Sequence, residues 1–187
     1  MGFAMVGNKS ITALSDDSDA GRIANLMYNR YRDATLRSHF WNGAMKRDTL
    51  GSVVGSPEFG FTNRHALPTD FIRLKAIEGD PEFRLETTKY VMSNESAIKI
   101  LYVYRVEDPG QLTDLYADAL ATRLASAFAA RFRNPKLAVE LWLMYEKKLS
   151  YARFVDSTEN TQDHLLAQTF TVTGRTAMPF EYGRTDI

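Results

Sequence analysis

Three histidines are the side chains of this sequence best suited to metal binding or to acid–base chemistry near neutral pH. His39, His65 and His164 lie far apart in the chain and show no metal-ligand spacing. The sequence contains no cysteine, which excludes thiolate ligands and disulfides. We therefore expect structural or surface roles for the three histidines, and no metal or other cofactor.

An acidic cluster, Asp16, Asp17 and Asp19, has the composition of the opening of a calcium-binding loop. Such a loop needs glycine at its sixth position and glutamate at its twelfth, but counting from Asp17 gives Arg22 and Tyr28. Acidic side chains also cap the exposed amides at the start of a helix. We interpret the cluster as a helix start and not as a calcium site.

Motifs of catalytic sites do not stand out in the chain. Gly51, Gly55 and Gly60 are not followed by the Gly-Lys-Ser or Gly-Lys-Thr of a phosphate-binding loop. The serines lie outside any nucleophile elbow, and no local signature selects a catalytic pair from the 23 acidic residues. The sequence therefore predicts that the protein is not an enzyme.

Basic side chains are frequent in the first predicted helical region. Such a flank can line a DNA channel, although it is also typical of a solvated helix surface. The 23 lysines and arginines balance the 23 acidic residues, so no net charge favours general nucleic-acid binding. The candidate residues for a basic channel face are Arg30, Arg32, Arg37, Lys46 and Arg47.

The first part of the chain has the apolar spacing of a helix. From residue 19, apolar side chains recur at three and four residues as far as Leu50. One straight helix of this length is unusual in a small domain, and the apolar stripe drifts near Arg32. We therefore expect two helices, or one kinked helix, with Asp33 available to cap the second.

The middle of the chain changes character. Glycines and prolines between residues 51 and 70 indicate a loop. Apolar and charged side chains then alternate in the segment of about 71–106, which is the pattern of short antiparallel strands. Two helices are expected next, because Asp108-Pro109 and Asn134-Pro135 each combine a capping residue with a proline at the first helical position. Trp41 and Trp142 lie in apolar stripes, so we expect both in the core.

These patterns predict a mainly α fold. Residues 1–157 are expected to form a single α-helical bundle domain with a small inserted antiparallel β-sheet at about 71–106. Residues 158–187 are expected to form an extended C-terminal tail, because the apolar periodicity ends there. No apolar run is long enough to cross a bilayer, so no membrane association is expected.

Three stretches together resemble the head-to-tail connector proteins of short-tailed phages, the tail tubular protein A or tail accessory factor family. They are residues 31–47 (YRDATLRSHFWNGAMKR), 60–74 (GFTNRHALPTDFIRL) and 102–109 (YVYRVEDP), the last leading into ALATRLA at 119–125. The family usually has a tyrosine before Ala-Leu-Pro, where this chain has His65. The resemblance covers roughly residues 15–155.

The resemblance implies a structural virion protein. Such adaptors form a ring of about twelve subunits under the portal protein ring, extend the DNA channel and carry a downstream tail (nozzle) protein. Packaged DNA would pass without sequence-specific binding, and the protein would assemble in the host cytoplasm and reside in the connector of the virion. Portal binding would use anchors in the C-terminal tail, for which the candidates are Phe170, Val172, Phe180 and Tyr182.

Two other classes of function remain open from the sequence. A peptidoglycan-degrading, tail-associated hydrolase would need two carboxylates with separated pKa values in a cleft. A non-viral soluble binding module would present a preformed pocket and have no affinity for a portal.

Overall fold

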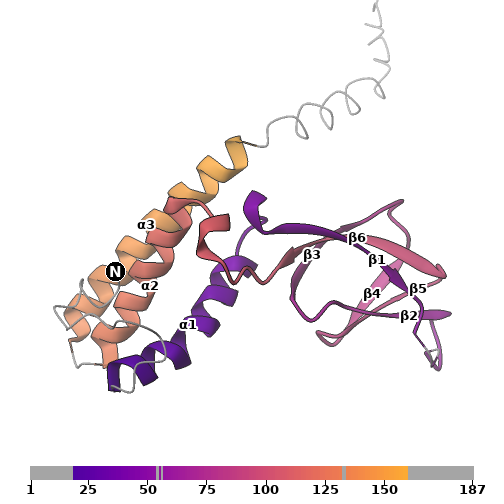
Figure 1. Cartoon of the computed structure of the whole chain (residues 1–187), viewed down its shortest axis with the longest axis horizontal. Coiled ribbons are helices and arrows are strands. Elements are labelled where there is room, and N and C mark those ends of the chain that lie inside the picture. Colours follow the sequence, from indigo (N-terminus) through magenta and orange to yellow (C-terminus); the bar gives the residue numbers. More distant parts are fainter. Residues whose placement is uncertain (1–18, 54, 56, 132–133, 160–187) are drawn as a thin grey trace, which may run out of the picture.

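The computed structural model describes residues 19–53, 55, 57–131 and 134–159 of the chain (Figure 1). Three helices occupy one half of this part of the molecule and six strands the other. The helices are α1 (Asp19–Arg37), α2 (Asp114–Arg131) and α3 (Pro135–Thr158), with short 3₁₀ turns at Asn42–Ala44 and Pro109–Gln111. The strands are β1 (Met45–Gly51), β2 (Asn63–Ala66), β3 (Phe71–Ile77), β4 (Phe83–Glu86), β5 (Tyr90–Ser93) and β6 (Ala97–Tyr104).

The prediction of a mainly α bundle with a small inserted sheet is wrong. The strands form two antiparallel three-stranded sheets, in the orders β1-β6-β3 and β2-β5-β4. The first sheet begins at Met45, within the segment expected to continue a helix, and β1 pairs with β6 from Met45↔Val103 to Gly51↔Ala97. Leu50 is the only buried residue of β1. The strand therefore lacks the alternation of buried and exposed side chains that identifies a strand in a sequence. Backbone pairing with β6, which the sequence does not display, holds this segment extended.

The short strand β2 lies in the segment expected to be a loop. It has only four residues, too few for a clear period of two, and it pairs with β5. Its central side chain, His65, is fully buried and lies 3.0 Å from the Ser93 hydroxyl through Nε2. His65, for which a structural or surface role was expected, is therefore a buried residue of the second sheet.

Helix α1 continues past the expected break. Arg32 and Asp33 lie within one uninterrupted helix that ends at Arg37, so Asp33 does not act as a cap. Its carboxylate instead accepts hydrogen bonds from Arg32 Nε and Arg105 Nε, each at 3.0 Å. The ion pair with Arg105 ties α1 to the segment that follows β6.

Helices α2 and α3 form an antiparallel hairpin (Figure 1). The Asn134 side chain accepts a hydrogen bond from Leu137 N, and Pro135 follows at the first helical position. The buried side of α2 is lined largely by small residues, which let the helices approach closely. Among the described helices, none combines the length and apolarity that a membrane span requires.

Two larger apolar clusters join the elements of the described part. One joins the helices to one end of the first sheet, where Trp41, Leu36 and Tyr116 pack with Val103. The other lies between the two sheets, where Ile100 and Tyr102 of β6 pack with the cluster that includes Val91 of β5. Successive residues of β6 thus supply both clusters, because side chains alternate across a strand.

Candidate functional site

The outward side of α3 carries a row of large apolar side chains. The opposite side of the helix, with Leu141, Tyr145 and Leu149, is buried. The outward residues are between 47% and 65% exposed and recur at helical spacing, so they lie on one face. Scattered exposed apolar residues are ordinary, but several on one face of a single helix are typical of an interaction surface. This α3 outer face comprises Val139, Leu143, Met144, Tyr151 and Phe154.

At the edge of this face, Trp142 flanks an arginine. Trp142 is 43% exposed, so the expectation that it lies in the core is wrong, whereas Trp41 is buried as expected. The guanidinium of Arg123 on α2 lies 4.9 Å from the Tyr31 ring, 5.1 Å from Trp142 and 4.9 Å from Tyr145. A cation over aromatic faces is attracted by their quadrupoles. Arg123 therefore connects all three helices.

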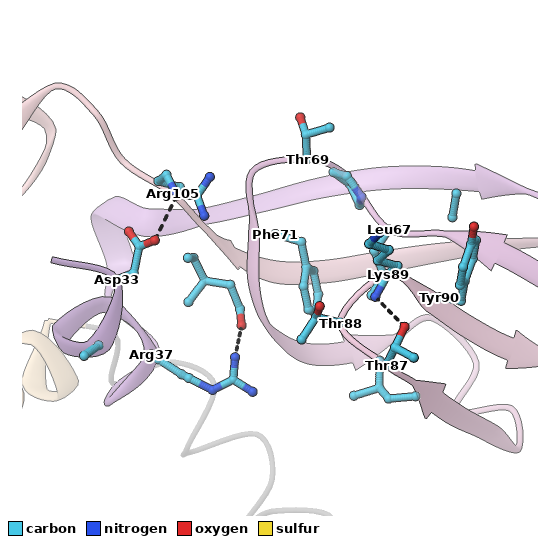
Figure 2. A pocket seen from close by; sticks show the side chains of 15 residues that line it. Asp33, Arg37, Leu67, Thr69, Phe71, Thr87, Thr88, Lys89, Tyr90 and Arg105 are labelled. Atoms are coloured by element: carbon cyan, nitrogen blue, oxygen red, sulfur yellow. Dashed lines mark hydrogen bonds and ion pairs between the residues drawn. The ribbon is translucent and has the colours of Figure 1, made fainter. Parts of the chain in front are cut away.

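A cavity of about 700 Å³ lies between α1, the start of β3 and the turn that joins β4 to β5 (Figure 2). Its apolar surface includes Leu67, Phe71 and Leu85. Its polar groups include three cations, one carboxylate and the hydroxyls of three threonines. The charged groups are Arg37, Lys89, Arg105 and Asp33. The cavity is therefore amphipathic and carries more positive than negative charge.

Two of these cations are held in place by the fold. The pairing of β3 with β6 shifts register between Phe71 and Arg73, which leaves Ile72 in an irregularity of the strand. Arg37 donates a hydrogen bond of 2.6 Å from Nη1 to the Ile72 carbonyl. Arg105 uses Nε to bind Asp33. Each guanidinium is thus fixed through one edge, while its other nitrogens remain for additional bonds.

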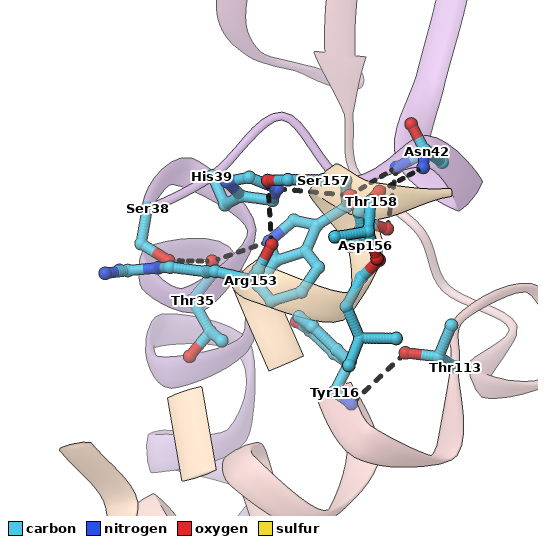
Figure 3. A network of polar contacts seen from close by, with 12 residues as sticks. Thr35, Ser38, His39, Asn42, Thr113, Tyr116, Arg153, Asp156, Ser157 and Thr158 are labelled. Carbon is cyan, nitrogen blue, oxygen red and sulfur yellow. Dashed lines mark hydrogen bonds and ion pairs between the residues drawn. The ribbon is translucent and has the colours of Figure 1, made fainter. Parts of the chain in front are cut away.

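A polar network joins the end of α3 to the segment before β1 (Figure 3). Asp156 is buried and accepts hydrogen bonds from the backbone N–H of Asn42, at 3.1 and 3.2 Å. The Asn42 side chain donates back to the Asp156 carbonyl at 2.7 Å, and His39 Nε2 lies 3.1 Å from Asp156 Oδ2. Burial lowers the pKa of His39 below its usual value, although Asp156 opposes this shift. Because a carboxylate oxygen accepts, His39 Nε2 is the donor in this contact.

The five residues proposed for a basic channel face lie on two elements. Arg30 and Arg37 are exposed on α1, whereas Arg32 is buried and binds Asp33. Lys46 and Arg47 are exposed neighbours on β1 and point to opposite sides of the strand.

Lys46 is already engaged by an acidic partner. It donates to Asp70 at 3.0 Å, and this bond raises the pKa of Lys46. Asp70 also accepts from the Tyr102 hydroxyl at 3.1 Å, and burial together with that bond raises the pKa of Tyr102.

The structure describes two of the three histidines and none of the candidate portal-binding residues. His39 and His65 have structural partners, and the described residues contain no group of three or more side chains suited to hold a metal. His164, the tail segment after Glu159 and the portal-binding candidates Phe170, Val172, Phe180 and Tyr182 lie outside the described residues.

Sequence reasoning did not identify Lys89, Arg105, Arg123 or Asp156. The first three are brought to their sites by the packing of separate elements, which no local spacing encodes. For Asp156 a signal existed, because it follows Leu149 and Ala152 at the spacing of the buried side of α3. A charged residue at a buried helical position indicates a buried polar contact.

Comparison of the chain with protein-family models gives no match, and comparison with curated proteins also gives none.

Proposed function

We propose that the protein is a structural virion protein that forms a ring under a portal and joins the head of a short-tailed phage to its tail. The proposal rests on the resemblance of residues 31–47, 60–74 and 102–109 to that family of connectors. In this role it extends the DNA channel, binds the portal ring and provides a platform for a nozzle protein. Its contribution is assembly and not catalysis.

The observation that best supports an assembly function is the α3 outer face. Five large apolar side chains exposed along one helix are costly for a monomer in water, and burial against a partner removes that cost. Lys136, Glu140 and Lys147 lie on the same side of α3 and are exposed. A mixed apolar and charged face suits a contact between subunits that must remain dissolved before assembly.

The same proposal names residues for the face of the DNA channel and for the contact with the portal. Arg30 and Arg47 are the candidate basic residues that are exposed and have no role in the hydrogen bonds described above. Phe170, Val172, Phe180 and Tyr182 are proposed as portal anchors. Removing residues 160–187 should then abolish portal binding while the cooperative unfolding of the remaining chain persists.

The test is electron microscopy of the full chain mixed with its candidate portal, alongside sedimentation of each component alone. We expect added ring density under the portal. The double variant Leu143→Glu/Phe154→Glu should lose this density, because it places charge in the proposed contact between subunits. Phe59→Glu is the matched control, since Phe59 is an exposed aromatic residue on the loop before β2 and should tolerate the charge.

The outcomes separate the proposal from its alternatives. A wild-type protein that stays monomeric and does not associate with the portal would contradict the adaptor function. Equal loss of the ring in the double variant and in Phe59→Glu would contradict the role of the α3 outer face and leave the adaptor function standing.

A further inference from the structure

We propose that the cavity between α1, β3 and the β4–β5 turn binds an extended acidic peptide of a partner protein. The site is separate from the α3 outer face, and the inference does not depend on the proposed adaptor function. Figure 2 shows Arg37 and Arg105 on one side of Phe71 and Lys89 on the other. Cationic side chains therefore lie on both sides of the apolar ring of Phe71.

The two arginines are oriented before any ligand arrives. Arg37 bonds Ile72 through Nη1, which leaves its Nε and Nη2 edge for a ligand. Arg105 bonds Asp33 through Nε, which leaves its two terminal nitrogens. Each free edge has the two parallel donors that match a carboxylate. Little side-chain entropy is then lost on binding, because one bond to the fold already holds each guanidinium.

The opposite wall of the cavity has a strained backbone. Thr87 in the β4–β5 turn has φ of +59°, a conformation that β-branched residues rarely adopt. Its hydroxyl accepts a hydrogen bond from Lys89 N at 3.2 Å and helps to maintain the turn. Such strain is found preferentially at functional sites. Here it fixes the segment that carries Thr88 and Lys89 into the wall of the cavity.

A peptide fits this lining better than a nucleic acid does. Asp33 lies among the cations and would repel a continuous phosphate backbone, whereas separate carboxylates can bind the arginines and Lys89 individually. Phe71 and Ile72 lie at the start of β3, and Leu85 lies on β4; within the described sheets both strands are edge strands. Edge strands can pair with an added extended segment. Apolar side chains of that segment would contact Leu67, Phe71 and Leu85.

The test is fluorescence anisotropy of the full chain with a fluorescein-labelled peptide in which glutamate and valine alternate. We expect saturable binding, and no binding of the counterpart in which lysine replaces glutamate. Lys89→Gln should weaken binding at least about tenfold, as expected for loss of a charge-assisted bond. Lys89 is exposed, so this variant should fold normally. Arg37→Gln should weaken binding similarly, and Arg37→Lys less.

The control variant is Arg47→Gln, which removes an exposed arginine that does not line this cavity. Unchanged affinity in Arg47→Gln supports the assigned site. Equal weakening in Arg47→Gln and Lys89→Gln would overturn the proposal, because binding would then depend only on overall charge. Two further results would also overturn it. They are an absence of saturable binding up to about 1 mM peptide, and tighter binding of a short single-stranded oligonucleotide that depends on the same residues.

Discussion

Asp156 in the last turn of α3 accepts a hydrogen bond from the backbone N–H of Asn42, 114 residues earlier in the chain, at 3.1 Å from Oδ1. Asn42 lies three residues before β1, so this contact joins the end of the last helix to the start of the first sheet. His39 and the Asn42 side chain complete the network around the same residue. Asp156 thereby couples the helical half of the molecule to its strands.

Replacing Asp156 by alanine should destabilise the protein by about 1–3 kcal/mol, because the part-buried donors Asn42 N and His39 Nε2 lose their acceptor. Asp156→Asn should cost less, since its amide oxygen can still accept from Asn42 N. Urea unfolding followed by circular dichroism measures both. Ser157→Ala is the control and should change stability by less than about 0.5 kcal/mol, because Ser157 is exposed. Equal effects at the two positions would refute the coupling role of Asp156.

The same network should make stability depend on pH. Burial lowers the pKa of His39 in the folded protein below the ordinary value of 6.5 that applies to the unfolded chain. At a pH between the folded-state and unfolded-state pKa values of His39, the unfolded chain binds more protons than the folded chain. The free energy of unfolding therefore falls as the pH drops below about 6.5, and it becomes constant below the folded-state pKa.

His39→Gln isolates this effect, because glutamine can place an N–H donor near Asp156 but does not titrate. The free energy of unfolding, measured from pH 8 to pH 5, should depend less on pH in the variant than in the wild type. Identical slopes for the two proteins would show that His39 does not control this dependence.

Part of the fold could be predicted because local signals there agree with tertiary packing. The Asn134-Pro135 pair marks the start of α3, and the strands β3 to β6 lie in the segment whose side chains alternate. Asp108-Pro109 was expected to start a helix directly, but a 3₁₀ turn follows it and α2 begins only at Asp114. The first sheet could not be predicted at β1. Phe40, Trp41 and Ala44 continue a helical spacing, but a turn after Arg37 and pairing with β6 override it.

The candidate sites were harder to predict than the elements. Arg37 was identified as a basic residue, but its orientation depends on the irregularity at Ile72, which arises from the pairing of β3 with β6. Lys89 reaches the same cavity from a turn far along the chain. The α3 outer face was not identified from the sequence, because periodicity alone does not show which side of a helix is buried when both sides are apolar.

Arg123 should contribute to stability through the three rings around it. Its Nε is buried and has no hydrogen-bond partner within the described part of the chain, so the rings of Tyr31, Trp142 and Tyr145 provide its main favourable contacts. Arg123→Ala should cost about 2 kcal/mol, from lost cation–π attraction and lost packing of the side-chain stem. Thermal and urea unfolding measure this cost.

A matched arginine on the same helix tests whether the rings are responsible. Arg131 is exposed near the end of α2, and Arg131→Ala should stay within about 0.5 kcal/mol of the wild type. A double-mutant cycle between Arg123→Ala and Trp142→Ala should give a favourable coupling energy. If the two single effects simply add, Trp142 does not interact with the arginine.

Thr87 should be a position where a substitution stabilises the protein. Asparagine tolerates positive φ better than a β-branched residue, and its side-chain oxygen can still accept a hydrogen bond from Lys89 N. Thr87→Asn should therefore raise the free energy of unfolding by about 0.5–1 kcal/mol. Thr88→Asn is the control, because Thr88 is exposed in the same turn without positive φ, and it should have little effect. If Thr87→Asn is no more stable than Thr88→Asn in thermal unfolding, the turn at Thr87 stores no strain that asparagine can relieve, and strain no longer supports the proposed peptide site.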